Sequence, residues 1–286
     1  MEFTKTHGAG NDFIILEAGS SPADWSGLAI AMCDRHLGIG ADGLLVLAPS
    51  EIADFRMRIF NADGSESDTC GNGLRCLSRY YIDKLKTACR NGEIQVETMA
   101  GIRKVIISGP GADIIKTAMG VPLYKKDQIP VIIKGNGEGI VYIKDMINIP
   151  LTIEDTELHL DLVSMGNPHA VLFGDNPPAD FPLSRIGPEA ERNEVFPAGV
   201  NFEAARVTDR NHIEARVWER GVGETLACGS GACAITVAAR LHGFVDNNVE
   251  VKLPGGILEV EWDGIGEVFL SGPTEKVFTG NWPDNK

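Results

Sequence analysis

The chain carries the stretch RIFNADGSESDTCGNG at residues 58–73 and repeats its pattern at residues 216–231 as RVWERGVGETLACGSG. In each stretch an aromatic residue stands ten residues before a cysteine, and the cysteine is followed by Gly-x-Gly. The two cysteines are Cys70 and Cys228. Self-similarity at a fixed separation is the sequence signature of a repeated structural unit, so the pattern suggests two similar halves.

Two further pairs of segments match in the same order along the chain. Residues 10–15 resemble residues 166–171, and residues 96–102 resemble residues 251–257. The offsets between the halves are 156 residues for the first pair, 158 for the cysteines and 155 for the second pair. Three matches in nearly constant register predict two pseudo-symmetric α+β domains with a cleft between them.

The expected secondary structure has the same order in each half. Residues 55–60 and 212–218 alternate apolar and polar side chains as half-buried strands do. Each is followed by a glycine-bearing loop and then a helix-like stretch, over residues 74–81 and 232–241. Gly243 is expected to end the second helix. Further strand-like runs occur at Val96, Val105–Ile107, Val249–Leu253, Leu258–Glu261 and Val268–Leu270.

Composition excludes several classes of protein. With 43% hydrophobic and 23% charged residues the chain is expected to bury a core, which excludes disorder. The net charge of −14 disfavours nucleic acid and anionic membranes as partners. No apolar run is long enough for a transmembrane helix, and no signal peptide is visible. A cytoplasmic protein whose six cysteines are reduced thiols is the expectation.

The Cys-Gly-x-Gly motifs are predicted to begin helices. Unpaired N–H groups and the positive end of the dipole make such a terminus a site for a carboxylate or phosphate. A thiol there is expected to have a lowered pKa, and to act as a base or nucleophile. The alternative reading is two structural cysteines, but their equivalence favours function. A metal site is disfavoured, because Cys70-x5-Cys76 and Cys228-x4-Cys233 are wider than usual zinc pairs. The remaining thiols, which are expected to be core or surface groups, are Cys33, Cys76, Cys89 and Cys233.

A cleft with amide and charged side chains would suit a small zwitterion. Arg220 can bind a carboxylate, and Glu219 can accept a hydrogen bond from an ammonium group. His169 could tune a nearby thiol, although a lone histidine is more often simply hydrogen-bonded in place. Neither a nucleotide-binding motif nor a lysine placed for pyridoxal phosphate is seen. The proposed lining residues are Asn11, Asn61, Asn167, Asn201, Glu219 and Arg220.

Sequence blocks that combine these residues run through the chain. They are Lys5–Phe13, Asp34–His36, Gly38–Gly43, Phe60–Ser65, Cys70–Gly73, Gly166–His169, Gly199–Phe202, Glu219–Thr225 and Ala227–Gly231. Together they resemble the diaminopimelate epimerase family, cofactor-independent amino-acid epimerases of lysine and peptidoglycan precursor synthesis. The likeness covers essentially the whole chain.

The resemblance implies an α+β fold of two pseudo-symmetric domains, each a mostly antiparallel barrel-like sheet wrapped around a central helix. The first domain would span residues 1–122, with the C-terminal segment 275–286 packing back on it. The second would span residues 123–274. The resemblance also implies a homodimer, for which Phe278 matches an aromatic residue implicated in the contact.

A two-base mechanism is the activity that the resemblance implies, interconverting LL- and meso-diaminopimelate. Cys70 and Cys228 would be the catalytic pair, one thiolate removing the α-proton and the other thiol protonating the opposite face. Glu219 and the Arg220 backbone would hold the reacting ammonium group, and His169 and Glu219 would modulate the thiols. Backbone N–H groups would hold the reacting carboxylate at Gly71, Asn72, Gly229 and Ser230. Side chains would hold the distal L-centre at Asn61, Asn167, Asn201 and Arg220, and Asn11 completes the substrate-binding set.

Two positions depart from some family members: Gly43 stands where some carry Gln, and Ser230 where Thr is common. Other functions remain open at this stage. The chain could be an epimerase or racemase of the same architecture that acts on another amino acid. It could also be a non-catalytic binding or redox protein in which Cys70 and Cys228 form a disulfide.

Overall fold

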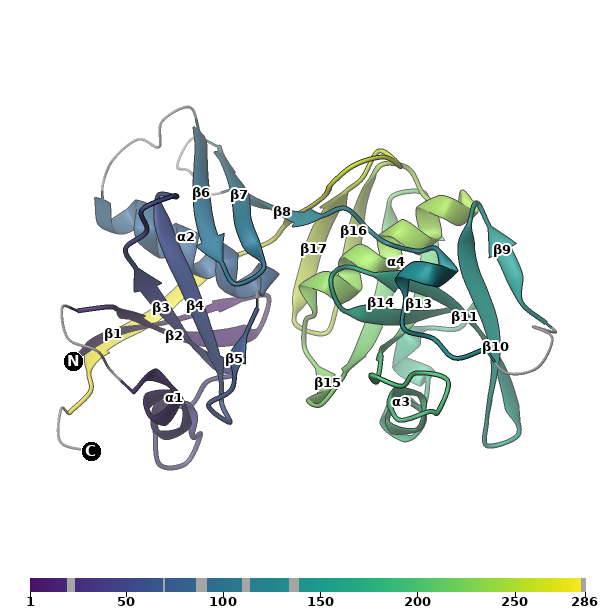
Figure 1. The fold of residues 1–286 in the computed structure, drawn as a ribbon, viewed down its shortest axis with the longest axis horizontal. Helices are drawn as coiled ribbons and strands as arrows, with labels where there is room; N and C mark the ends of the chain where they lie inside the picture. The colour runs from purple at the N-terminus through teal and green to yellow at the C-terminus, as the bar shows by residue number, and fades with distance from the viewer. Residues whose placement is uncertain (20–23, 69, 86–91, 110–113, 134–138, 284–286) are drawn as a thin grey trace. The chain divides into compact units, whose positions relative to one another are not determined.

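The computed structural model describes residues 1–19, 24–68, 70–85, 92–109, 114–133 and 139–283. The chain forms two compact units (Figure 1). Unit 1 comprises Met1–Ala118 together with Ser271–Lys286, and unit 2 comprises Met119–Leu270. Unit 1 is therefore built from both ends of the chain, whereas unit 2 is continuous.

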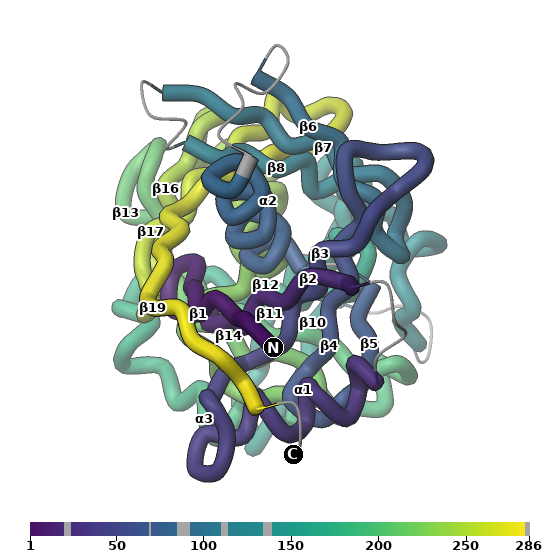
Figure 2. Tube along the Cα trace, turned by 90° about the vertical axis from the view of Figure 1, so that its left-hand side faces the viewer, coloured from purple at the N-terminus to yellow at the C-terminus, as the bar shows by residue number. Residues whose placement is uncertain are grey.

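Unit 1 contains strands from the first part of the chain, the C-terminal strand and two helices. In chain order they are β1 (Glu2–Gly8), β2 (Asn11–Glu17), α1 (Trp25–Cys33), β3 (Gly43–Ala48), β4 (Phe55–Asn61), β5 (Glu66–Ser67), α2 (Gly71–Leu85), β6 (Glu93–Thr98), β7 (Gly101–Ser108), β8 (Ile114–Gly120), whose last residues belong to unit 2, and β19 (Glu275–Asn281). β19 lies antiparallel to β1, so the two chain ends share one edge of the unit (Figure 2).

Unit 2 repeats this order of elements after two further strands. Its members are β9 (Val141–Ile143), β10 (Met146–Ile153), β11 (Thr156–Ser164), β12 (Pro168–Phe173), α3 (Leu183–Glu191), β13 (Asn201–Asp209), β14 (His212–Glu219), β15 (Gly223–Thr225), α4 (Gly229–His242), β16 (Asn248–Leu253), β17 (Gly256–Glu261) and β18 (Val268–Ser271).

Strand pairing is the same in both units. In unit 1, β2 runs parallel to β3 across α1, and β4 runs parallel to β6 across α2. In unit 2, β12 runs parallel to β13 across α3, and β14 runs parallel to β16 across α4. Antiparallel pairs join β1 to β2, β3 to β4 and β6 to β7, and their counterparts β11 to β12, β13 to β14 and β16 to β17. The predicted internal repeat and the mostly antiparallel α+β fold are confirmed.

One helix lies against the strands of each unit and carries much of its core (Figure 1). In α2, Leu74 and Leu77 pack with Phe13, Leu45 and Val96 from the surrounding strands. In α4, eleven of the fourteen residues are buried, and most of them are small. Small side chains let the strands approach this helix closely on several sides. The predicted arrangement of several strands around one main helix is therefore present in both units.

A second helix in each unit was not predicted from the sequence. α1 is apolar on nearly every side and shows no clear helical period, although Asp24 caps it by accepting a hydrogen bond from the Gly27 N–H at 2.9 Å. α3 contains Gly187 and Pro188, which sequence rules treat as helix breakers. Each helix connects two strands that run parallel to each other. A parallel pair needs such a crossover connection, and the local helix propensity of the sequence does not reveal it. Within the described ranges, no helix is both long and apolar enough to cross a membrane.

Candidate functional site

The predicted site residues occupy equivalent places in the two units. Asn11 is the first residue of β2, and Asn167 stands just before β12. Gly43 and Asn201 are the first residues of β3 and β13, and Asn61 and Glu219 are the last residues of β4 and β14. Cys70 and Cys228 stand just before α2 and α4. Because these elements are topological counterparts, each unit presents its own set at four matching positions. The repeat therefore organises the candidate site as well as the fold.

Both Cys-Gly-x-Gly motifs begin a helix, as predicted. The sulfur of Cys70 accepts a hydrogen bond from the Gly73 N–H at 3.4 Å, and the sulfur of Cys228 accepts one from the Gly231 N–H at 3.4 Å. Each thiol thus takes the place of an N-capping side chain. Gly71, Asn72, Gly229 and Ser230 are the first residues of the two helices, where N–H groups lack acceptors within the helix. Such groups can hold a carboxylate.

The Cys228 thiol lies in a closed, acidic environment. It is only 4% exposed, and it is hydrogen-bonded to the Glu219 carboxyl group and lies 3.5 Å from Ser230 Oγ. Burial raises the pKa of this thiol well above its usual value, and the nearby Glu219 and Glu203 carboxyl groups act in the same direction. The prediction of a lowered pKa is therefore wrong for Cys228. The Gly231 N–H does favour the thiolate, but burial and the two carboxyl groups outweigh it.

Glu219 has a second hydrogen bond and a perturbed acidity of its own. Thr225 Oγ1 donates to its Oε1. Burial raises the pKa of Glu219, even though the hydrogen bonds from Thr225 and Cys228 favour its charged form. Glu219 and Cys228 are therefore two neighbouring acidic groups, and burial disfavours the charged form of each.

His169 lies in a chain of polar contacts that runs toward the start of α4. The ring is fully buried, with Nδ1 2.6 Å from Glu203 Oε1 and Nε2 3.1 Å from Asn167 Oδ1. Asn167 Nδ2 in turn donates to Ser230 Oγ at 3.5 Å. Glu203, which the sequence analysis missed, is a fully buried carboxyl group on β13. The one signal for it was an acidic residue flanked by the apolar residues Phe202 and Ala204.

Asn201 and Arg220 join two loops beside this chain of contacts. Asn201 Nδ2 donates to the Pro168 carbonyl at 2.9 Å, and its Oδ1 accepts from the Arg220 N–H at 2.9 Å. The Arg220 guanidinium donates to the Ala198 carbonyl at 2.8 Å and is otherwise exposed at the surface. Both the Nδ2 and the Oδ1 atom of Asn201 thus make hydrogen bonds within the unit. Arg220 keeps further N–H donors available for an anion.

In unit 1 an amide cluster surrounds Cys70. Its sulfur lies 3.8 Å from Asn11 Oδ1, which also accepts from Asn72 Nδ2 at 3.2 Å. Asn11 Nδ2 donates to Asp42 Oδ2 at 2.7 Å, and Asn72 Oδ1 accepts from Arg75 at 2.6 Å. The structure therefore brings together three of the predicted residues, Asn11, Cys70 and Asn72, and fixes the orientation of both amides.

Charged residues behind Asn11 hold this cluster in place. Asp12 Oδ1 and Asp42 Oδ1 each accept from the Arg35 guanidinium at 2.7 Å. The buried Lys5 ammonium donates to Asp12 at 2.6 Å. Burial opposes charge on Asp12, but the hydrogen bonds from Arg35 and Lys5 lower its pKa to about 2. Asp42, which orients Asn11, is thus anchored in a network that stays charged at neutral pH.

Three predicted positions lie apart from these contacts. Asn61 is exposed, and its amide donates to Ser65 Oγ at 2.9 Å within the turn after β4. At Gly43 a Cβ atom would lie 2.9 Å from the Phe60 carbonyl oxygen, so a Gln at this position would require the backbone to shift. Phe278 lies on β19, 46% exposed, with its ring 5.9 Å from that of Phe3.

No disulfide joins the five cysteines within the described ranges. Cys33, Cys76 and Cys233 are buried as core residues, and burial raises the pKa of Cys33 and of Cys76 to about 12. They lie within the core, whereas Cys70 and Cys228 stand at helix starts. Cys89 lies outside the described residues. In the described part of the chain no three His, Cys, Asp or Glu side chains are grouped to hold a metal ion.

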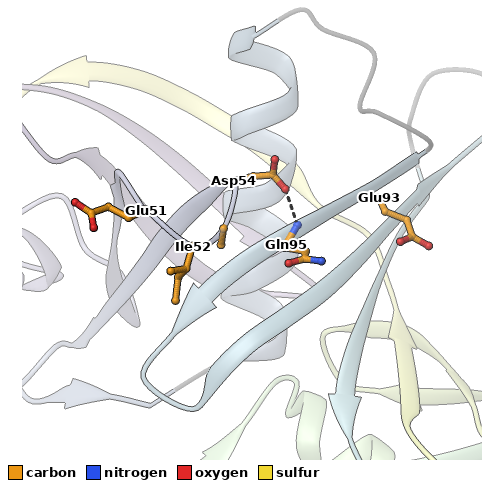
Figure 3. Close-up of a pocket in the computed structure, with 6 residues that line it drawn as sticks. Glu51, Ile52, Asp54, Glu93 and Gln95 are labelled. Carbon is orange, nitrogen blue, oxygen red and sulfur yellow. Dashed lines mark hydrogen bonds between the residues drawn. The ribbon is translucent and has the colours of Figure 1, made fainter.

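A pocket of about 410 Å³ opens on unit 1, away from the predicted site residues (Figure 3). It is lined by Glu51, Ile52, Ala53, Asp54, Glu93 and Gln95. The Asp54 carboxylate accepts a hydrogen bond from the Gln95 N–H at 2.7 Å and so joins the loop before β4 to β6. None of the thiols or amides described above lines it.

Solved structures with the same fold include a phenazine biosynthesis protein of the PhzF family from Bacillus anthracis, with a TM-score of 0.69 and 18% identity over 98% of both chains. A hydroxyproline epimerase from Agrobacterium vitis also has a TM-score of 0.69, with 14% identity over 98% of this chain and 91% of its own. At these identities the likeness concerns the fold alone.

Sequence comparison is more specific. Residues 3–125 and 162–277 match the family described as diaminopimelate epimerase. The diaminopimelate epimerase of Acetivibrio thermocellus is 43% identical over 98% of both chains, and that of Halothermothrix orenii is 44% identical over 98% of this chain and 97% of its own. Matching blocks, two equivalent cysteine sites and near-complete coverage agree. The chain belongs to the diaminopimelate epimerase family, a family of isomerases in the racemase and epimerase class.

Proposed function

We propose that this chain interconverts LL-diaminopimelate and meso-diaminopimelate without a cofactor, using Cys70 and Cys228 as its two bases. The observation that carries the proposal is the equivalence of these cysteines, each capping the central helix of one of two units with the same topology. The names of the relatives supply the substrate. By the same resemblance the reaction would serve lysine and peptidoglycan precursor synthesis in the cytoplasm.

In the proposed reaction, one sulfur takes the α-proton of the substrate as a thiolate, and the other thiol gives its proton to the opposite face of the same carbon. One C–H bond of the substrate breaks and one forms. The sulfur that began as a thiolate then carries a proton, and the other sulfur is left as a thiolate. The raised pKa of Cys228 suits it to start as the proton donor. After donation, its thiolate regains a proton from solvent, while the other thiol releases the proton that it took, and the reverse reaction uses the two sulfurs in exchanged roles.

Charge develops on the substrate carboxylate as the α-proton leaves. Backbone N–H groups at the starts of α2 and α4, from Gly71, Asn72, Gly229 and Ser230, are the donors proposed to stabilise it. Glu219 and the Arg220 backbone would hold the reacting ammonium group. The distal L-centre would be held by Asn61, Asn167, Asn201 and the Arg220 side chain, with Asn11 completing the set on unit 1.

A homodimer is part of the proposal. Its support is β19, where Val277 and Phe278 are 53% and 46% exposed although both are apolar. Exposed apolar side chains on a strand edge are features of a surface that another chain can cover. The family resemblance at Phe278 points to the same strand.

The test is solvent exchange by the purified enzyme in D2O with LL-diaminopimelate and no pyridoxal phosphate. Deuterium at the α-carbon together with formation of the meso isomer is expected. Cys70→Ala and Cys228→Ala should each lower kcat by about a thousandfold, since each removes a general acid or base. Absence of exchange and epimerisation in the wild type would refute the catalytic proposal, and normal turnover in either variant would refute the two-base assignment.

Matched controls exist in the same two helices. Cys76 of α2 and Cys233 of α4 are buried cysteines away from the helix starts. Cys76→Ala and Cys233→Ala should keep activity while losing some stability. Proline, hydroxyproline and single-centre amino acids complete a substrate panel. Faster turnover of any of these than of diaminopimelate would replace the proposed substrate and keep the mechanism.

A further inference from the structure

Glu203 is a buried carboxyl group that the proposed mechanism does not use. Its side chain is fully buried on β13, and its Oε2 atom has no hydrogen-bond partner among the residues that the structure describes. Its other oxygen is 2.6 Å from Nδ1 of His169. An unpaired polar atom in the interior is costly, so its presence calls for a role.

The contacts of the His169 ring define where its protons are. An amide oxygen only accepts hydrogen bonds, so the 3.1 Å contact with Asn167 Oδ1 requires a proton on Nε2. The contact between Nδ1 and Glu203 requires one further proton between nitrogen and oxygen. That proton can reside on either atom, as imidazolium with carboxylate or as imidazole with carboxylic acid. In both forms the pair has no net charge, which suits complete burial.

We infer that Glu203 is a positioning residue, which uses this shared proton to hold His169 with its Nε2–H directed at Asn167 and so fixes the direction of the Asn167 amide. The inference rests on the proposed function, in which Asn167 binds substrate. With Oδ1 held by His169, Asn167 Nδ2 points to Ser230 Oγ at the start of α4. Burial raises the pKa of Glu203, in keeping with a carboxyl group that retains its proton.

Two substitutions separate the hydrogen bond from the rest of the side chain. Glu203→Leu removes the partner of Nδ1, so the ring can move its proton from Nε2 and lose the contact with Asn167. We expect KM for diaminopimelate to rise about tenfold, the loss associated with one charged-group hydrogen bond, with kcat little changed. Glu203→Gln retains a group that can donate to Nδ1, so its KM should stay within about threefold of wild type.

A matched control is the other buried carboxylate–histidine pair of unit 2. Asp161 is 2% exposed and accepts from His242 Nε2 at 2.7 Å, and His242 is the last residue of α4, at the end opposite Cys228. Asp161→Asn should lower the thermal midpoint without raising KM. In a His169→Gln background, Glu203→Leu should add no further rise in KM, because its effect passes through His169.

A second measurement does not depend on activity. In protein labelled with [15N]histidine, the Nε2-bound proton of His169, assigned by its loss in His169→Gln, should be present in the wild type and in Glu203→Gln and absent in Glu203→Leu. If Glu203→Leu does not fold, Glu203→Asp is expected to give the same losses, since the shorter chain cannot reach Nδ1. Wild-type KM together with an intact Nε2–H signal in these variants would overturn the positioning role. A wild type that does not epimerise diaminopimelate would overturn the proposed function, while the signal still reports on Glu203.

Discussion

The Cys228 thiol is held in its protonated form by the side chains around it. Glu219 accepts its hydrogen bond, and the negative charge of Glu219 opposes a thiolate. The charge raises the pKa of the thiol, in the same direction as burial. In the proposed reaction the acidity of Cys228 is therefore controlled by whether Glu219 carries a charge, and binding of an ammonium group beside Glu219 would change that balance.

Replacement of Glu219 tests this control. In Glu219→Gln the acceptor charge is removed, so the pKa of Cys228 should fall and its alkylation by iodoacetamide near neutral pH should become faster. Turnover should fall at the same time, by about a hundredfold, because the proposed site loses the carboxylate that holds the reacting ammonium group and tunes the thiol. Alkylation rates against pH, read by mass spectrometry of the Cys228 peptide, measure the first effect.

Glu224→Gln provides the control for that experiment. Glu224 lies on the neighbouring strand β15 and pairs with Arg216 at 2.8 Å, away from the thiol. Its replacement should leave the alkylation profile of Cys228 unchanged. An unshifted profile in Glu219→Gln would show that Glu219 does not control the acidity of Cys228.

Sequence reasoning located the cysteines because a repeated motif marks them, but it misjudged the acidity of Cys228. The helix start that it considered is present, whereas Glu219 approaches the thiol only after β14 and β15 have paired. Glu203 was missed for a similar reason. An acidic residue within a strand usually faces solvent, and only the packing of β12 beside β13 places Glu203 against His169.

Among the elements, α3 connects packing to the candidate site most directly. Gly187 faces β14, and a Cβ atom there would lie 2.6 Å from the Trp218 ring. Trp218 precedes Glu219 in β14, and its indole N–H donates to Glu191 at 2.7 Å. Glycine thus allows the helix to lie close against the strand that carries Glu219.

Gly187→Ala should therefore disturb both stability and activity. Forced contact with Trp218 is expected to cost about 1–3 kcal/mol in the free energy of unfolding, as overpacking does. A shift of Trp218 would also move Glu219 and lower kcat. Urea unfolding and tryptophan fluorescence report on the first effect, and epimerisation assays on the second. Gly174→Ala, with no atom within 4 Å of the added Cβ, is the control, and equal losses in the two variants would contradict this account.

The strands were predictable where burial alternates with exposure. Phe55, Met57 and Ile59 are buried in β4 and Ile213 and Val217 in β14, which matches the alternation in the sequence. Gly243 adopts the left-handed conformation, with φ of 81°, and ends α4 as expected. The crossover helices α1 and α3 were not predictable by the same means, because their role comes from the parallel strands that they connect.

For the molecule as a whole, the repeat explains why a two-base chemistry fits this fold. A duplicated unit supplies two thiols, each at the start of a helix, without requiring the chain to evolve two unrelated sites. The units are not identical in what surrounds the thiol. Asn11 and Asn72 lie near Cys70, whereas Glu219 and Ser230 lie near Cys228. In the proposed reaction, this difference places unlike side chains beside the two thiols that act on opposite faces of one α-carbon.

Association of two chains is the remaining property at this scale. Phe278 packs its ring edge-on to Phe3 on one face of the β1–β19 pair, and it remains 46% exposed. If β19 forms the proposed dimer contact, Phe278→Asp places a charge at its apolar centre and should yield a monomer. Ile52, 65% exposed in the loop before β4, lies outside β19, so Ile52→Asp should leave the dimer intact. Sedimentation velocity distinguishes the two states, with circular dichroism to confirm that both variants are folded. A wild-type monomer, or dissociation of both variants alike, would contradict a dimer centred on Phe278.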